Sequence, residues 1–275
     1  MQTGGSPKPR SATAVRRAQV VDFLKSIDRS QTVDDLAAHF SVSVSTLRRD
    51  VDALAKEREV WKIAGGFVTV RRPEPDWHEK ELSQREAKAA MARRAAKKLV
   101  QMGDVVFLDS GTSTGFVARL LAEREDLTLI VAGMAPLSAV AGGAAEVIVL
   151  GGKLRTHSGS FLGGLATSNL RSITPDVAFL GCDALVPSRG VNCPRLDSAD
   201  FKTLVMRQSR RSWILADETK LTGEPDEAYW APLSRTSGLL TVEPEGVEAR
   251  NRINELLGAG HRVEVAPRPS VKPAD

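Results

Sequence analysis

Along the first seventy positions, apolar residues recur every three or four residues, which is the spacing of one face of a helix. This spacing predicts three successive helices, over 13–27, 33–40 and 44–58. Two β-prone segments then lie on either side of Gly65-Gly66 and predict a hairpin. Three helices followed by a hairpin is the order of elements in a winged helix-turn-helix domain.

Beyond this region the pattern changes to continuous apolar runs that alternate with helical stretches. The runs expected as strands cover 105–108, 127–131, 147–150, 177–180, 213–215, 239–242 and, as a last edge strand, 263–265. The helices expected around them cover 84–102, 114–124, 135–144, 198–211 and 248–257. Apolar strands that alternate with helices imply a parallel sheet covered on both faces. The expected fold class is therefore α/β, with a small N-terminal winged helix-turn-helix and a larger Rossmann-like parallel-sheet domain.

Composition predicts the boundaries between these parts. Residues 1–12 have no apolar stretch of their own and are expected to be a disordered tail, as residues 266–275 are expected to be a frayed one. The winged helix-turn-helix is expected over 13–70 and the larger domain over 85–265. Residues 71–84, with two prolines and mixed charges, are expected to be a linker.

The formal net charge of +4 is concentrated at one end of the chain. Residues 1–72 hold 13 Lys and Arg against 8 Asp and Glu, whereas residues 73–275 hold 25 against 26. A basic front and a near-neutral body suggest a nucleic-acid-binding head. With 42% hydrophobic and 26% charged residues, the composition excludes a largely disordered protein.

Other features of the sequence bear on membrane association, cellular compartment and metal binding. No apolar stretch reaches the roughly 20 residues of a membrane helix, and no secretory signal is visible, so we expect no membrane partner. Two cysteines, Cys182 and Cys193, fit a reduced, cytoplasmic protein. Four scattered histidines offer no metal spacing, and we expect neither a metal nor a cofactor.

The third predicted helix has the side chains expected of a DNA reader. Ser45, Thr46, Arg48 and Arg49 project from its first two turns, away from the apolar side. The N-terminal end of such a helix enters the major groove, where Arg bonds guanine edges and hydroxyls meet bases or phosphates.

Arg48 and Arg49 also lie beside Asp50 and Asp52, so an ordinary ion-paired surface is the alternative. The helix order, the short turn, the hairpin and the local charge excess together favour DNA binding. The residues expected to form this surface, with its helix caps and wing, are Thr32, Ser43, Ser45, Thr46, Arg48, Arg49, Lys62, Gly65 and Gly66.

The segment 109–115, Asp-Ser-Gly-Thr-Ser-Thr-Gly, follows one predicted strand and precedes a helix. A turn rich in Gly and hydroxyl residues offers bare backbone N–H groups, and the helix dipole favours an anion there. A tight connection without a ligand is the alternative. The chain has neither Gly-x-Gly-x-x-Gly nor a Walker Gly-Lys-Ser/Thr, so a nucleotide is not the leading ligand. Further polar groups follow other strands, where α/β folds build ligand sites.

Two stretches carry a resemblance to a known family. Residues 40–51, Phe-Ser-Val-Ser-Val-Ser-Thr-Leu-Arg-Arg-Asp-Val, followed by Gly65-Gly66, resemble the N-terminal signature of the DeoR family of bacterial transcriptional regulators. The later order of Asp-x-Gly-Thr-Ser, Gly-Gly, Phe-x-Gly, a lysine helix and Asp-x-x-Lys resembles the effector domain of that family, which is similar to ribose-5-phosphate isomerase. The resemblance covers about residues 13–243.

The resemblance implies that the effector is a phosphorylated sugar or a related metabolite, with its phosphate on residues 111–114. The residues implied to line this site are Asp109, Gly111, Thr112, Ser113, Thr114, Gly151, Gly152, Lys153, Asp183, Lys202 and Lys220. The chain departs from the family pattern at Ala132-Gly133-Met134, at Asp200 and at Glu243.

The expected function is a cytoplasmic, sequence-specific transcriptional regulator, a repressor of carbohydrate metabolism genes that a phosphorylated sugar controls. Its expected partners are a double-stranded DNA operator and a second copy of itself, in a dimer or tetramer, because one small head offers few base contacts. Two alternatives stay open. One is a sugar-phosphate isomerase-like enzyme with an appended DNA-binding head, using Asp109 and Asp183 for acid–base chemistry. The other is a structural nucleoid protein that ignores metabolites.

Overall fold

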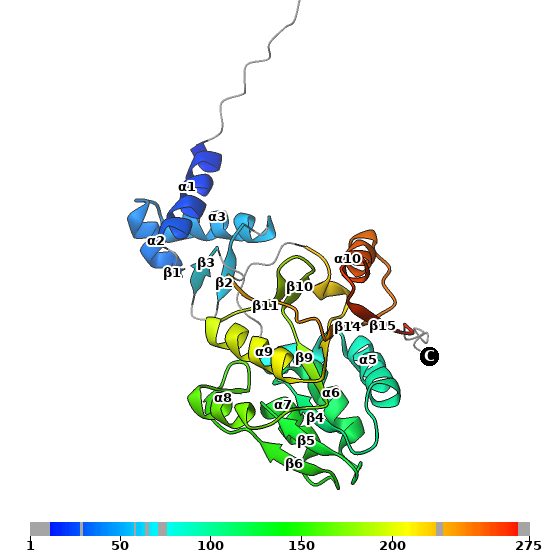
Figure 1. The fold of residues 1–275 in the computed structure, drawn as a ribbon. Helices are drawn as coiled ribbons and strands as arrows, with labels where there is room; N and C mark the ends of the chain where they lie inside the picture. The colour runs from blue at the N-terminus through cyan, green and yellow to red at the C-terminus, as the bar shows by residue number, and fades with distance from the viewer. Residues whose placement is uncertain are drawn as a thin grey trace, which may run out of the picture. The chain divides into compact units, whose positions relative to one another are not determined.

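The computed structural model describes residues 12–27, 30–57, 59–63, 66–70, 76–223 and 228–268. The chain divides into two compact units, Met1–Glu74 and Pro75–Asp275. Figure 1 shows a small helical unit with a short sheet and a larger unit of helices around a long sheet.

The first unit is a winged helix-turn-helix. Its described elements are α1 (Ala12–Ile27), β1 (Gln31–Thr32), α2 (Val33–His39), α3 (Val44–Lys56), β2 (Trp61–Ile63) and β3 (Phe67–Thr69). The three helices form because their apolar positions share one face, and Leu24, Leu36 and Leu47 meet in a common buried core. The predicted helices and hairpin are present. Strand β1 was not predicted, because its two residues become a strand only by pairing with β3.

The second unit is built on a seven-stranded sheet of order β15-β14-β12-β9-β4-β5-β6. The strands are β4 (Val105–Leu108), β5 (Thr128–Val131), β6 (Glu146–Val149), β9 (Val177–Gly181), β12 (Arg211–Leu215), β14 (Ser237–Val242) and β15 (Arg262–Ala266). Every pairing in this sheet is parallel, as the alternation of apolar runs and helices predicted.

Both faces of this sheet are buried under helices. In β4, Phe107 belongs to one core, whereas Val106 and Leu108 belong to the core on the opposite face. This alternation follows from the pleat, which sends successive side chains to opposite faces. The first core is closed by α8 (Gly164–Arg171), α9 (Leu196–Gln208) and α10 (Val247–Gly258). The second is closed by α5 (Arg85–Lys98), α6 (Thr112–Leu121) and α7 (Met134–Val140).

Several elements of the second unit were not predicted. They are α4 (Trp77–Leu82), α8, the hairpin β7 (Lys153–Arg155) and β8 (Ser160–Leu162), the small sheet of β10 (Ala184–Val186), β11 (Gly190–Cys193) and β13 (Tyr229–Ala231), and the 3-10 turn η1 (Glu218–Lys220). Their short strands lack the long apolar runs that identified the main sheet.

Two expected boundaries differ from the structure. Residues 77–82, inside the segment expected as a linker, form helix α4 in the second unit, started by an Asp76–Glu79 capping box. Ala266, expected in a frayed tail, is buried and pairs with Val242 in the sheet. The expected tail over 1–12 lies almost wholly outside the described residues, and Ala12 begins α1. No helix in the described part of the chain is long and apolar enough to cross a membrane.

Candidate DNA-binding helix and effector site

Helix α3 begins with a ring of hydroxyl groups. Ser43 is the N-cap, and its Oγ accepts a hydrogen bond of 3.2 Å from the Thr46 backbone N–H. The Ser43 hydroxyl also lies 3.0 Å from Ser45 Oγ and 2.8 Å from Thr46 Oγ1. These hydroxyls therefore stabilise the first turn of the helix whose N-terminal half was predicted to meet DNA.

The buried face of α3 carries a charge as well as apolar residues. Asp50 is buried, and its carboxylate accepts hydrogen bonds from Arg16 Nε at 2.6 Å and Arg17 Nε at 3.0 Å. Both arginines come from α1, so this ion pair joins α1 to α3. By contrast, Arg48 and Arg49 are exposed, and neither forms an ion pair with any residue that the structure describes. The interpretation of these two arginines as an ion-paired surface is therefore not supported.

The wing is attached to α3 by a salt bridge. Lys62 Nζ of β2 lies 2.6 Å from Asp52 Oδ1, and this hydrogen bond holds the pKa of Asp52 below its ordinary value. Thr32 is the N-cap of α2. Its hydroxyl oxygen accepts a hydrogen bond from the Asp35 backbone N–H and so stabilises the start of that helix. Gly66 adopts a φ of +77°, which favours glycine, and Gly65 lies outside the described residues.

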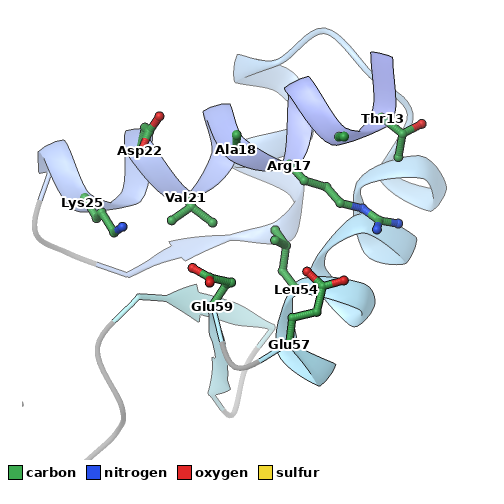
Figure 2. Close-up of a pocket in the computed structure, with 10 residues that line it drawn as sticks. Thr13, Arg17, Ala18, Val21, Asp22, Lys25, Leu54, Glu57 and Glu59 are labelled. Carbon is green, nitrogen blue, oxygen red and sulfur yellow. The ribbon is translucent and has the colours of Figure 1, made fainter. Parts of the chain in front are cut away.

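A hollow of about 470 Å³ lies between α1 and the C-terminal end of α3 (Figure 2). Val21 and Leu54 form part of its floor, and charged side chains that include Arg17 and Glu57 surround them. It shares no residue with the predicted DNA-binding surface, which uses the N-terminal half of α3.

In the second unit, the predicted anion loop connects β4 to α6. Gly111 is the N-cap of α6 and provides no side-chain cap hydrogen bond, so the amides of the first turn lack the partner that a Ser or Asp cap would give them. The buried hydroxyl of Thr114 donates to the carbonyls of Asp109 and of Gly111, the latter at 2.6 Å, which holds the loop in shape. The loop therefore presents backbone donors at a helix N-terminus.

Gly133, at a departure from the family pattern, packs directly against this loop. A Cβ atom added at Gly133 would lie 2.5 Å from the Cβ of Ser110. Only glycine fits this position without displacing the loop.

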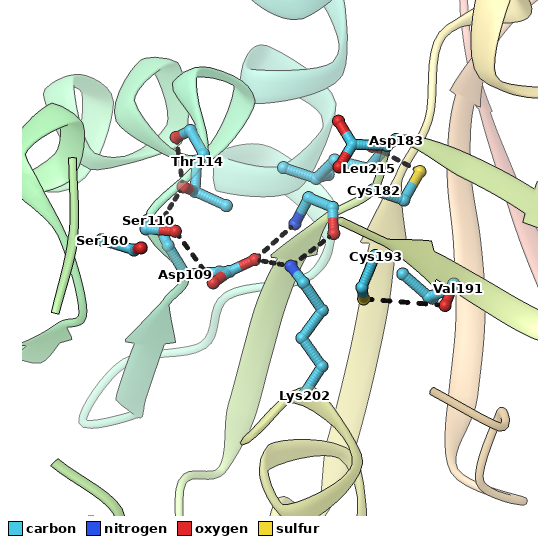
Figure 3. A network of polar contacts seen from close by, with 12 residues as sticks. Asp109, Ser110, Thr114, Ser160, Cys182, Asp183, Val191, Cys193, Lys202 and Leu215 are labelled. Atoms are coloured by element: carbon cyan, nitrogen blue, oxygen red, sulfur yellow. Dashed lines mark hydrogen bonds and ion pairs between the residues drawn. The ribbon is translucent and has the colours of Figure 1, made fainter. Parts of the chain in front are cut away.

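Asp109, directly after β4, is buried and forms an ion pair with Lys202 of α9, which is largely covered (Figure 3). Asp109 Oδ2 accepts from Lys202 Nζ and, at 3.1 Å, from the Gly181 backbone N–H. Lys202 Nζ also donates to the Gly181 carbonyl at 2.8 Å. Burial by itself would lower the pKa of Lys202, but its neighbours, with the Asp109 carboxylate first and the Asp183 carboxylate adding to it, together raise that pKa above its ordinary value. Lys202 therefore stays charged, with a third N–H that neither of these two partners uses.

Asp183 is paired with a lysine that the sequence did not suggest. Lys80 Nζ of α4 lies 2.8 Å from Asp183 Oδ1. Burial alone would raise the pKa of Asp183, but the charges of Lys80, Lys220 and Lys202 lower it below its ordinary value. A carboxylate with a lowered pKa is a weaker general base, which argues against the acid–base role offered for it.

Lys88 is a second lysine that the sequence did not suggest. It is 5% exposed on α5 and donates to the carbonyls of Lys80 and, at 2.7 Å, Ser83. Burial lowers its pKa to about 8, with the Asp217 carboxylate opposing this shift and the Lys220 charge adding to it. Four lysines, Lys80, Lys88, Lys202 and Lys220, thus gather with the carboxylates of Asp109, Asp183, Asp217 and Glu81 at this edge of the sheet.

Part of the predicted site is not joined to this cluster. Gly151 and Gly152 adopt positive φ, and a Cβ on Gly152 would meet the Leu162 carbonyl at 2.7 Å. Lys153 is exposed and pairs with Leu162 in the β7–β8 hairpin. The described backbone contacts of this turn are therefore with β8 and α8, and not with Asp109 or Lys202.

The two cysteines show no sign of reactivity. Burial raises the pKa of Cys182 to about 12, so its thiol is protonated at neutral pH. Cys193 is fully buried, and neither cysteine forms a disulfide in the described part of the chain. Among the described residues, no group of three or more His, Cys, Asp or Glu is placed to hold a metal ion.

Comparison with protein families accounts for both units. Residues 16–72 match the DeoR-like helix-turn-helix domain, and residues 83–241 match the DeoR C terminal sensor domain. The chain belongs to the DeoR family. It is thus a transcriptional regulator with a helix-turn-helix for DNA and a sensor domain, and the alternative that it is an enzyme is wrong.

Curated relatives of this DeoR-family regulator match over most of their length. The chain is 32% identical to the putative aga operon transcriptional repressor of Escherichia coli O157:H7, over 76% of this chain and 79% of that one. It is 32% identical to the HTH-type transcriptional regulator GlpR of Haloferax volcanii, over 87% and 94%. Among solved structures, ribose 5-phosphate isomerase A from Methanocaldococcus jannaschii is similar, with 18% identity, a TM-score of 0.38 and coverage of 51% and 56%.

Proposed function

We propose that this regulator represses carbohydrate metabolism genes and that a phosphorylated sugar, or a related metabolite, bound to the sensor domain controls its hold on operator DNA. Relatives named as a repressor of the aga operon and as the repressor AccR support the direction of regulation. We place the protein in the cytoplasm, with DNA binding in residues 13–70 and effector binding in residues 85–265.

The observation that carries the effector proposal is the uncapped first turn of α6 next to a cluster of lysines. A helix N-terminus with free amides attracts a phosphate, because its N–H groups and its dipole both favour negative charge. Lys202 is paired with Asp109, which precedes this turn, and its ammonium keeps a third N–H that neither Asp109 nor the Gly181 carbonyl uses. The four lysines of this cluster provide cationic donors for a dianion beside the carboxylates that they pair with.

On the DNA side, the proposal rests on α3. Its exposed Arg48 and Arg49 are free to donate to guanine or to phosphate, and Ser45 and Thr46 lie on the same first two turns. One α3 helix reads only a few base pairs, so we propose a homo-oligomer, a dimer or tetramer, that binds repeated half-sites.

The effector proposal is tested with Ser113→Asp, which adds a carboxylate to the first turn of α6, and with the matched control Ser168→Asp on the exposed side of α8. A panel of sugar phosphates is screened by thermal unfolding, and each hit is added to the protein bound to DNA from upstream of its own gene. A ligand at 100 times its Kd should add about 2.7 kcal/mol to the unfolding free energy. This gain should vanish in Ser113→Asp and persist in Ser168→Asp. If no phosphorylated compound stabilises the wild type, the effector proposal is wrong and a regulator that ignores metabolites is favoured.

A further inference from the structure

Helix α4 lies between the two family matches, which end at residue 72 and begin at residue 83. It has no buried residue, and Leu82 at its end is 71% exposed. An apolar face normally decides where a helix packs, but α4 packs only the half-buried Trp77, whose ring lies beside Gly159, so its polar contacts provide most of what holds it. The partners in those contacts therefore determine when α4 is held and when it is released.

These partners belong to the proposed effector site. Lys80 Nζ is paired with Asp183 at 2.8 Å, and the Lys80 carbonyl accepts a hydrogen bond of 3.4 Å from the Thr112 hydroxyl. Thr112 is the first residue of α6. At the start of α4, the Trp77 backbone N–H donates to the His157 carbonyl at 3.1 Å.

The joint between α4 and α5 consists of two residues, Ser83 and Gln84, and the second has an unusual conformation. Gln84 has a φ of +52°, a left-handed value that is rare for a residue other than glycine. The chain therefore breaks between the two helices and does not continue as one rod. Lys88, in the first turns of α5, holds the end of α4 by donating to the carbonyls of Lys80 and Ser83.

We propose that Lys80 is a binding residue for the anionic effector and that the effector releases α4. The effector does so by replacing Asp183 as the partner of the Lys80 ammonium and the Lys80 carbonyl as the acceptor of the Thr112 hydroxyl. Both groups are donors, so phosphate oxygens at the first turn of α6 compete for them directly. A phosphate group carries nearly two negative charges against one on Asp183, which favours the exchange. Lys202 and Lys220 remain near Asp183 and stabilise its charge afterwards.

This inference rests on the proposed effector site and adds the route by which that site acts on DNA binding. Helix α4 is the first described element after the DNA-binding unit in the chain. Its release lengthens the connection between the two parts. A longer connection lowers the effective concentration of the second head at its half-site, so the effector weakens operator binding.

The test is hydrogen–deuterium exchange of the full-length protein, titrated with inorganic phosphate at constant ionic strength, with chloride as the matched salt. In the wild type, phosphate should slow exchange over residues 112–115 and speed exchange over residues 77–83. In Lys80→Gln, residues 77–83 should exchange about fivefold faster than in the wild type before phosphate is added, the effect expected of a half-exposed ion pair. Phosphate should then change that exchange little.

Two further variants complete the design. Asp183→Asn breaks the same pair from the other side and should also speed exchange over residues 77–83. Lys98→Gln removes an exposed lysine of α5 and should behave as the wild type. Protection of 112–115 without faster exchange of 77–83, or a Lys80→Gln protein with wild-type exchange, would overturn the role of Lys80 and leave the effector site standing. Absence of any protection over 112–115 would overturn both.

Discussion

The proposed DNA-reading helix α3 and the proposed effector site hold their charged residues in opposite ways. On α3, Leu47 and Val51 pack into the core while Arg48 and Arg49 stand exposed and without a described ion-pair partner. At the effector site, in contrast, the charged groups are themselves part of the packing, and Lys202 is held against Asp109 below the surface.

This difference separates function from stability in one region and joins them in the other. An exposed charge has little effect on folding, because water solvates it in the folded and in the unfolded chain. A buried charge whose partner is removed is expensive, because no water replaces the missing interaction. Substitutions on the exposed side of α3 should therefore change DNA affinity and leave the unfolding free energy unchanged. Substitutions at the proposed effector site should change the unfolding free energy as well as effector binding.

The largest expected effect is that of Lys202→Met. The variant leaves Asp109 buried with only the Gly181 N–H and, at 3.5 Å, the Ser110 hydroxyl as described partners, so the free energy of unfolding of the second unit should fall by about 4 kcal/mol. Chemical denaturation followed by tryptophan fluorescence measures this change. The double variant with Asp109→Asn should recover a large part of the loss, because it removes the unpaired charge.

The exposed Lys98→Met on α5 is the matched control and should alter the unfolding free energy by less than about 0.5 kcal/mol. If Lys202→Met were as mild as this control, the pair with Asp109 would be dispensable for folding, and the contrast between the two regions would disappear.

The second-largest expected effect is a loss of operator affinity. Replacing Arg48 and Arg49 together with Ala should weaken operator binding roughly 100-fold, since each good base contact contributes about 1–3 kcal/mol. The unfolding free energy should change by less than about 0.5 kcal/mol, because both side chains are exposed. Fluorescence anisotropy over a range of salt concentrations measures affinity and its salt dependence. That dependence should flatten by about one unit for each arginine that bonds a DNA phosphate in the wild type.

Arg119→Ala, on the exposed face of α6, is the control, and it should leave both the affinity and the salt dependence unchanged. Unaltered binding in the double variant would exclude α3 as the DNA-reading helix.

The same contrast explains what the sequence predicted and what it did not. The helices, the wing hairpin and the parallel strands follow from local spacing of apolar residues, and the structure confirms them. Ser43 as the cap of α3 follows from residue type and position, and it is also confirmed. These features depend on neighbours a few residues apart, which periodicity can detect.

The effector site depends on residues far apart in the chain. Lys80 and Asp183 are 103 positions apart, and Lys202 and Asp109 are 93 apart. Nothing local indicates such pairs, so Lys80 and Lys88 were missed, and α4 was expected to be a linker. The motif order of the family led to Asp109, Asp183 and Lys202, but it also included Lys153, whose described backbone pairing lies in another hairpin.

A smaller effect is expected of Gly133→Ala. Its new methyl group would overlap Ser110 and displace the loop that begins α6, so the unfolding free energy should fall by about 2 kcal/mol and phosphate binding should weaken with it. Gly164→Ala, at the start of α8, adds its methyl group to open space and is the control. Thermal unfolding with and without phosphate measures both changes. An unchanged Gly133→Ala protein would contradict the close contact between this position and the loop.

The smallest expected effect is a pH dependence that belongs to the sensor unit. The pKa of Lys88 is about 8 in the folded protein against 10.5 for an ordinary lysine, so the unfolded chain binds more protons between these values. Burial of the charged form therefore costs stability below pH 8, and this cost shrinks as the pH rises toward 10.5. Relative to Lys88→Met, the wild type should gain about 1 kcal/mol between about pH 7 and pH 9. If the unfolding free energies of the two proteins changed equally with pH over this range, Lys88 would not be a buried charge at neutral pH. The charged residues of the proposed effector site would then affect folding as little as those of α3.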